Sequence, residues 1–261
     1  MNLTIYKVDA FSDRLFSGNP AAVVPCESDI SDSLMQSIAA ENNLSETAFV
    51  FGRDEKLRIR WFTPAMEVDL CGHATLAAGH VLFNHLDFPG ETVSFSSKSG
   101  PLHVRKDGKR LFLDFPADTL SAVDPPESLI DGLSVRPLET YKGRDDYLVI
   151  VDSQEAVLSL QPDMNLLSEV PARGVIVSSP GTDVDFVSRF FAPRVGVPED
   201  PVTGSAHTTL IPYWSERLGK RELSARQLSR RGGELICRQT DDSRVEIGGC
   251  AVTYLVGNIS V

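Results

Sequence analysis

The chain has 261 residues, of which 42% are hydrophobic and 23% are charged, which is typical of a globular protein and excludes a disordered or fibrous one. Its net charge of −11 argues against a nucleic-acid partner, because no strong basic stripe offsets the acidic residues. No apolar run reaches the ~18 residues of a membrane helix, and the first residues lack the layout of a secretory signal. The four cysteines show neither CxxC nor zinc spacing, so we expect reduced thiols in a cytoplasmic protein without a membrane segment.

Alternating apolar residues predict strands through the first half of the chain. The expected strands are 3–9, 20–25, 46–52, 57–63, 91–96, 101–105 and 110–115. A helix is expected over 31–42, with Ser31 as its N-cap. A second helix is expected over 72–85, and because it is apolar on nearly all sides we expect it to be buried.

The second half repeats this order. Strands are expected near 146–152, 173–179, 185–192, 234–238, 244–248 and 252–256, with helical stretches at 154–169, broken by Pro162, and at 204–218. A segment rich in Pro, Ser and Asp, 116–128, has the composition of an exposed linker between the halves.

Two short motifs indicate that the halves are duplicates. The sequence RWFTP at 60–64 is echoed 129 residues later by RFFAP at 189–193, and Gly72, which opens a helix, is echoed 132 residues later by Gly204. We therefore predict an α+β fold of two similar domains related by pseudo-twofold symmetry, 1–118 and 119–261. Each is expected to be a curved, mainly antiparallel, barrel-like sheet around a central helix. This prediction allows the C-terminal strand of the chain to join the sheet of the first domain.

Both helix starts carry small residues that suit anion binding. Gly72-His73-Ala74 and Gly204-Ser205-Ala206 would let a ligand approach backbone N–H groups at the positive end of a helix dipole. We expect the two starts to face each other across an interdomain cleft and to hold a small anionic metabolite without Lys or Arg.

Two nearby carboxylates are candidates for proton transfer. Glu46 begins a strand among apolar neighbours, and burial there would raise its pKa towards the range of a general acid–base. Asp200 lies on a loop stiffened by Pro198 and Pro201, five residues before Ser205.

Each of these side chains also has a structural interpretation. Glu46 could be an exposed strand-end carboxylate, and Asp200 a turn former. His73 could make only a local hydrogen bond. Cys71 is interpreted first as a small buried residue, and Cys71 with His73 gives too few ligands for a metal site, so no metal or other cofactor is expected.

Six motifs together resemble one known family. They are VDAFSDRLFSGNPAAVV, NLSETAFV, FTPAMEVDLCGHATLA, KSGPLHV, EDPVTGSAH and VEIGGCAVTYLVG, and in this order they resemble the phenazine-biosynthesis PhzF family from about residue 4 to the end of the chain. The resemblance implies a diaminopimelate-epimerase-like fold of two domains with the active site between them. It further implies a cofactor-free isomerase that forms homodimers and acts on a cyclic dihydro-hydroxyanthranilate.

The resemblance also implies roles for particular residues. The glutamate of the NLSET motif, here Glu46, would shuttle the proton next to Ser45. The pair at the first helix start corresponds to Gly72 and His73. The family's aspartate, glycine and serine at the second helix start match Asp200, Gly204 and Ser205.

This chain departs from the phenazine-producing members at three positions. Cys71 and Ala74 stand where those members have alanine and proline, and His207 stands where they have a small residue. Related racemases use two opposed thiols, whereas the second motif here, EDPVTGSA, contains no cysteine. The leading hypothesis is therefore a PhzF-like isomerase. The alternatives are an amino-acid racemase or epimerase, and a binding protein that keeps the fold without turnover.

Overall fold

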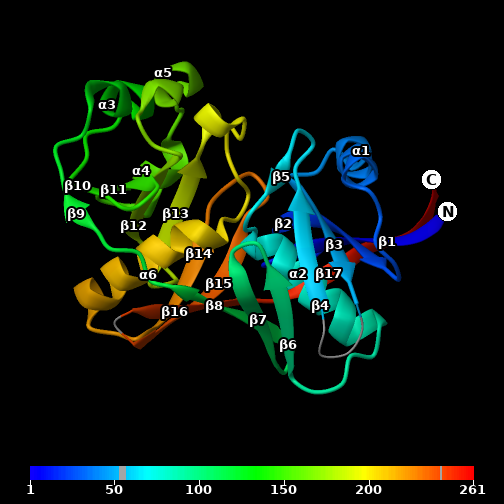
Figure 1. Cartoon of the computed structure of the whole chain (residues 1–261). Helices are drawn as coiled ribbons and strands as arrows, with labels where there is room; N and C mark the ends of the chain where they lie inside the picture. The colour runs from blue at the N-terminus through cyan, green and yellow to red at the C-terminus, as the bar shows by residue number, and fades with distance from the viewer. Residues whose placement is uncertain (53–56, 242) are drawn as a thin grey trace. The chain divides into compact units, whose positions relative to one another are not determined.

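The computed structural model of the chain describes residues 1–52, 57–241 and 243–261 (Figure 1). The chain divides into two compact units: unit 1 comprises Met1–Asp114 and Gly248–Val261, and unit 2 comprises Phe115–Ile247. The last strand belongs to unit 1 because it runs antiparallel to the first strand over almost its whole length, from Asn2 opposite Ser260 to Ala10 opposite Ala251.

Among the residues that the structure describes, unit 1 is a mixed sheet with two helices. Its strands are β1 (Asn2–Ala10), β2 (Asn19–Cys26), β3 (Glu46–Phe51), β4 (Leu57–Phe62), β5 (Glu67–Val68), β6 (Thr92–Ser97), β7 (Gly100–Asp107), β8 (Arg110–Pro116) and β17 (Ala251–Ser260). The pairings give the order β17-β1-β2-β3-β4-β6-β7-β8, in which β2–β3 and β4–β6 are parallel and the rest antiparallel. The short β5 pairs with β4.

The helix α2 (Gly72–His85) forms the centre of unit 1. It contacts β1, β2, β3, β7 and β17, so the sheet curls around it. Ten of its fourteen residues are buried, as expected for a helix that is apolar on nearly all sides. The other helix, α1 (Asp32–Asn42), contacts β3 and β4, and its N-cap Ser31 accepts a hydrogen bond from the backbone N–H of Leu34, as the sequence predicts.

Unit 2 repeats this plan. Its strands are β9 (Ser121–Ala122), β10 (Glu139–Lys142), β11 (Asp146–Ile150), β12 (Gly174–Pro180), β13 (Phe186–Phe191), β14 (Glu222–Gln227), β15 (Gly233–Asp241) and β16 (Arg244–Gly249). Its helices are α3 (Glu127–Leu133), α4 (Gln154–Ser159), α5 (Met164–Glu169), the 3-10 turn Pro193–Val195 and α6 (Gly204–Leu218). The long helix α6 contacts β11, β14 and β15.

The pairings of the two units correspond step by step. In unit 1 the helix α1 connects parallel strands β2 and β3, and in unit 2 the helices α4 and α5 connect parallel strands β11 and β12. An antiparallel partner follows in each unit, β4 or β13. The central helix, α2 or α6, then leads to a further parallel strand, β6 or β14. The same order of strand pairings and helices therefore occurs in both units, as the duplicated α+β fold predicted from the sequence requires.

The sequence missed the elements that lack strong periodicity. The strands β10 and β14 and the helix α3 were not expected, because elements of four to seven residues with mixed polarity carry little hydrophobic signal. The expected interruption at Pro162 is seen as the gap between α4 and α5. No residue of 116–128 is buried, although the segment contains β9.

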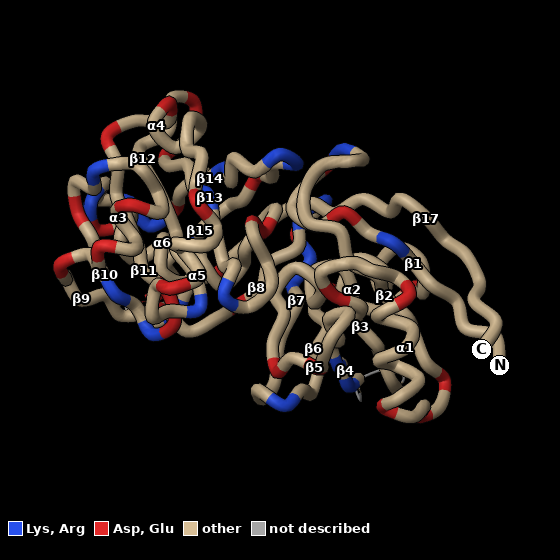
Figure 2. The backbone as a smooth tube through the Cα atoms, turned by 90° about the horizontal axis from the view of Figure 1, so that it is seen from above, with Lys and Arg blue, Asp and Glu red and all other residues tan. Residues whose placement is uncertain are grey.

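Charged residues are scattered over the backbone of each unit (Figure 2). No continuous basic stripe is visible along the part of the chain that is described. Among the same residues, no helix has both the length and the apolar character that crossing a membrane requires.

Candidate active site

The loop that leads into α2 is held by an ion pair. Arg60, on β4, donates from Nε and Nη2 to the two carboxylate oxygens of Glu67, at 2.7 and 2.9 Å. Both side chains are largely buried, at 15% and 17% exposed. The hydrogen bonds from Arg60 lower the pKa of Glu67 to about 2. Glu67 is therefore ionised at neutral pH, and its hydrogen bonds with Arg60 hold the loop in place.

Unit 2 has the same device on β13. Arg189 donates from Nε and Nη2 to Glu199, at 2.7 and 3.2 Å, and from Nη1 to the carbonyl oxygens of Val157 and Leu160. The arginines in the echoed RWFTP and RFFAP sequences thus serve the same purpose in both units, which is to anchor the loop before the central helix. The sequence revealed the echo but not the two glutamate partners.

Three reactive side chains meet at the start of α2. Nε2 of His73 lies 3.2 Å from Oε2 of Glu46, and Nδ1 of His73 lies 3.5 Å from Sγ of Cys71. Glu46 is there because β3 begins with it, in parallel register with Ala21 of β2. The strand start and the helix start, 26 residues apart in sequence, therefore deliver a carboxylate, an imidazole and a thiol to one place.

The imidazole of His73 is neutral at physiological pH. The residue is 6% exposed, and this burial lowers the pKa of His73 to about 3. Its Nδ1 faces Nδ2 of Asn19 at 3.3 Å, and since an amide nitrogen only donates, Nδ1 accepts and the ring proton sits on Nε2, towards Glu46. The 3.2 Å approach is not aligned as a full hydrogen bond. Such contacts often tighten only when substrate binds.

Asn19 is a site residue that was not expected from the sequence. This residue opens β2 and is completely buried. It belongs to the SGNPAAVV motif, in which a polar residue directly before an apolar strand was the available signal. Ser45 and Gly72, the two other residues expected here, are half-buried and flank Glu46 and His73 in sequence.

In unit 2 the expected site residues gather at the start of α6. Oγ1 of Thr203 donates to Oδ2 of Asp200 at 2.5 Å. The buried Gln227 fixes this loop, since it donates to the carbonyl of Asp200 and accepts from the backbone N–H of Thr203. Gly204 and Ser205 form the first turn of α6 directly after it.

His207 lies one turn further along α6 and is completely buried. Its Nδ1 donates to the carbonyl of Thr203, and burial lowers the pKa of His207 to about 4, so this ring is also neutral. Its ring lies 6.0 Å from that of Phe186. This environment makes His207 a packing residue of unit 2.

Both central helices begin without a side-chain cap. Neither Cys71, the N-cap of α2, nor Thr203, the N-cap of α6, accepts a hydrogen bond from a first-turn amide. By contrast, Ser31, Ser153 and Asp163 cap α1, α4 and α5. The N-cap side chains of α2 and α6 therefore do not occupy the first N–H groups of these helices, which is the arrangement that suits anion binding.

The chain matches the family model described as phenazine biosynthesis-like protein (PhzC-PhzF) over residues 8–257. It belongs to the PhzF family. An uncharacterised isomerase of Pseudomonas aeruginosa is 54% identical over 259 residues, which cover 99% of each chain. A PhzF-family protein from Enterococcus faecalis has a crystal structure similar to this chain with a TM-score of 0.97, at 44% identity and full coverage of both chains. This PhzF-family chain is accordingly an isomerase.

The fold extends beyond the PhzF family. A probable proline racemase from Agrobacterium radiobacter is similar with a TM-score of 0.66 at 10% identity, covering 99% of this chain and 93% of its own. At that identity the likeness shows a shared epimerase-type fold and nothing about the reaction. The PhzF assignment rests on the family match and on the more similar proteins.

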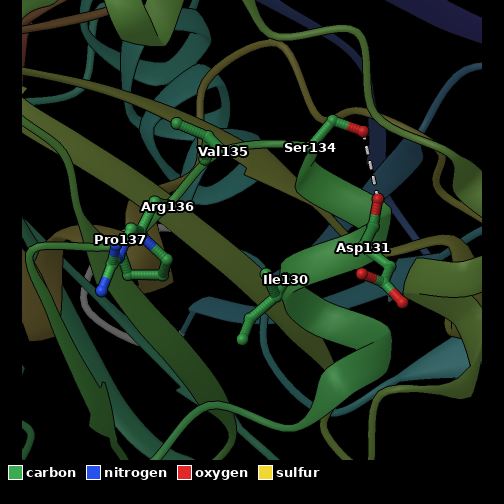
Figure 3. A pocket seen from close by; sticks show the side chains of 6 residues that line it. All are labelled: Ile130, Asp131, Ser134, Val135, Arg136 and Pro137. Atoms are coloured by element: carbon green, nitrogen blue, oxygen red, sulfur yellow. Dashed lines mark hydrogen bonds between the residues drawn. The ribbon is translucent and has the colours of Figure 1, made fainter.

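One hollow of the surface lies away from these residues. It has a volume of about 520 Å³ and lies beside α3 (Figure 3). Its lining residues are Ile130, Asp131, Ser134, Val135, Arg136 and Pro137. None of them is a site residue expected from the sequence, and the set offers one acidic and one basic side chain without a catalytic pair.

Proposed function

We propose that this PhzF-family protein moves a proton between two carbon positions of a small, carboxylated, cyclic metabolite, with Glu46 as general base and then general acid. The observation that carries this proposal is the 3.2 Å approach of Glu46 to a neutral, buried His73. A carboxylate in such a setting can accept a proton from carbon and return it, while the adjacent Nε2–H keeps it oriented.

The neutral state of His73 matters for this cycle. A protonated imidazolium beside Glu46 would hold the carboxylate in its ionised form and make it a weaker base. A neutral imidazole that donates one hydrogen bond orients the carboxylate at a smaller cost in basicity. We therefore assign His73 to the catalytic group as the partner of Glu46.

We further propose that the helix starts bind the substrate's anionic group. The N–H groups at Gly72, Gly204 and Ser205, which no N-cap side chain occupies, supply donors. The hydroxyl of Ser45, the residue before Glu46 in sequence, is proposed as a further donor. Asp200, already hydrogen-bonded by Thr203, serves as a second carboxylate for orienting the substrate or for proton transfer.

A two-thiol racemase is the weaker alternative. Cys71 and Thr203 occupy equivalent positions, since each is the residue before the glycine that starts a central helix. The second position thus carries a hydroxyl, and that hydroxyl donates to Asp200. This chain therefore lacks the second thiol that a two-thiol racemase requires at this position.

The decisive experiment is a screen for hydrogen exchange at carbon. Cyclic carboxylic acids and amino acids would be incubated with the protein in D₂O and analysed by mass spectrometry for deuterium uptake and for isomeric products. Exchange by the wild type that is lost in Glu46→Gln, and kept in the exposed matched control Glu41→Gln, supports the proposal. Equal exchange by Glu46→Gln would remove Glu46 from the mechanism.

Two further expectations follow from the family resemblance and remain proposals. We propose a homodimer, to be checked by light scattering coupled to size-exclusion chromatography. We also propose a cytoplasmic location, which suits the four free thiols, Cys26, Cys71, Cys237 and Cys250, and can be checked by cell fractionation.

A further inference from the structure

The group Glu46, Cys71 and His73 has a second chemical property besides proton transfer. Each residue offers one donor atom, a carboxylate oxygen, a thiol sulfur and an imidazole nitrogen, and these atoms all lie within 4.8 Å of one another. In the described part of the chain, no other three His, Cys, Asp or Glu side chains meet in this way. The sequence motif Cys71-x-His73 offered two ligands, and the fold adds the third.

We propose that Glu46, Cys71 and His73 form a buried binding site for a borderline divalent cation such as Zn²⁺, and that its occupation inhibits the isomerase by engaging Glu46. The inhibitory part rests on the proposed function of Glu46. The binding part does not, and is measured separately below.

The donor set suits zinc. Thiolate, imidazole and carboxylate are its three usual protein ligands, and three protein ligands leave a fourth position for water. Harder cations such as Mg²⁺ and Ca²⁺ prefer oxygen atoms alone. A thiolate and a carboxylate also balance the two positive charges of the ion, so the occupied site would be neutral in its buried surroundings.

The distances agree with a tetrahedral site after a small closure. With Zn–N, Zn–O and Zn–S bonds of about 2.0–2.3 Å, the edges of the tetrahedron are about 3.3–3.6 Å. The contact of Nε2 of His73 with Oε2 of Glu46, at 3.2 Å, is already of this size, whereas the 3.5 Å contact of Cys71 is with the other ring nitrogen, Nδ1, and is not an edge of this tetrahedron. The three donor atoms lie within 4.8 Å of one another, so the separations to Sγ of Cys71 must close by about 1 Å, which rotation of the Cys71 and Glu46 side chains supplies.

The imidazole has one nitrogen available for the metal. Nε2 of His73 is buried and, among the described residues, makes no well-formed hydrogen bond, so no such bond has to be broken. Nδ1 faces the amide of Asn19, 3.3 Å away. A metal on Nε2 requires the ring proton on Nδ1, so the amide of Asn19 must turn over to present its acceptor, Oδ1, in place of Nδ2.

Binding would displace the proton of the Cys71 thiol and leave Glu46 coordinated. A coordinated carboxylate cannot take a proton from carbon, which is why we expect inhibition. Because Cys71 is not needed for the proposed proton transfer, it separates the two roles of the group. Its loss should weaken metal binding, whereas the loss of Glu46 should abolish turnover with or without metal.

The binding test uses Zn²⁺ and Co²⁺ alone on the full chain after removal of metal by a chelator. Isothermal titration calorimetry should give one Zn²⁺ per chain, and Co²⁺ should give a thiolate-to-metal charge-transfer band. Removal of an outer-shell partner of a metal ligand already costs about 10–100-fold in affinity, so Cys71→Ala should weaken Zn²⁺ binding by at least about 100-fold. The matched control, Cys250→Ala, removes a half-buried thiol elsewhere and should bind as the wild type does.

Several results would overturn the proposal. They are no Zn²⁺ binding, binding that Cys71→Ala leaves unchanged, and a cobalt complex without the sulfur band. Cys71→Ser provides a second test, because serine is a good N-cap and should preserve the fold. If Zn²⁺ binds through Cys71 but does not inhibit deuterium exchange, the inhibitory part is wrong and the role of Glu46 must be judged from Glu46→Gln alone.

Discussion

Glu46 at the first position of β3 and His73 in the first turn of α2 face each other across 3.2 Å, carboxylate oxygen to imidazole nitrogen. The pair is 19% and 7% exposed, so solvent screens it little. His73 is held from its other side by Asn19 and sits beside Cys71. The geometry places a neutral imidazole where it can orient the carboxylate that we assign as the proton carrier.

The substitution Glu46→Gln should lower turnover by at least the ~10²–10⁴-fold that general acid–base catalysis contributes. Substrate binding should survive, because the helix N-termini rather than Glu46 are proposed to hold the anion. Deuterium exchange and ligand-induced thermal shift measure the two effects separately. Glu41→Gln, the same change at an exposed position of α1, should behave as wild type.

The imidazoles of His73 and His207 should stay neutral from pH 8 down to pH 5. Burial lowers their pKa values to about 3 and about 4, whereas the unfolded chain protonates near 6.5. The unfolded state therefore binds more protons between these values, so stability should fall as the pH drops below 6.5 towards 3. NMR titration of the histidine ring protons checks the first statement. Urea unfolding at a series of pH values checks the second. A signal from either ring that titrates near 6.5 would contradict the first.

Cys71→Ala should keep the fold and most of the activity. The thiol is buried and lies at the helix start, but the proposed proton transfer uses a carboxylate. A thiol catalyst would instead lose several orders of magnitude in rate. Deuterium exchange by the variant is the measurement, and inactivation by iodoacetamide in step with labelling of Cys71 would favour the racemase alternative.

The substitution Glu67→Gln should destabilise unit 1 by about 2 kcal/mol, because it weakens two charge-assisted hydrogen bonds from Arg60. The pKa of Glu67 is lowered to about 2, so the stabilisation is present above the unfolded value of about 4.3 and is lost as the pH falls towards 2. Urea unfolding at pH 7 and pH 3 tests both statements. The control is Glu222→Gln, since that carboxylate is 68% exposed in its pair with Arg238 and should change stability very little.

Exhaustive treatment with a chelator should leave the catalytic activity unchanged or increase it. The proposed reaction uses Glu46 and helix N–H groups and requires no metal or organic cofactor. Activity would be assayed before and after dialysis against a chelator, with Zn²⁺ added back. A loss of activity that Zn²⁺ restores would reverse the proposed role of the metal and make it a cofactor.

The sequence by itself determined the duplicated fold and the two helix starts. The apolar pattern of 72–85 gave the bounds of α2 without error, and the offset between Gly72 and Gly204 gave the correspondence of α2 with α6. These features are local or periodic, and one chain is enough to read them. The sequence also selected Glu46 and His73, through their place beside a strand start and a helix start.

Only the tertiary structure decided which of these side chains meet. Parallel pairing of β2 with β3 brings Asn19 and Glu46 to the start of α2, and no local pattern encodes that register. The same is true of the glutamate partners of Arg60 and Arg189, and of the third donor beside Cys71 and His73. Contacts between segments far apart in sequence depend on how strands pair and on how a sheet curls around its helix. Hydrophobic periodicity reports which face of an element is buried, but not which distant residue it is buried against.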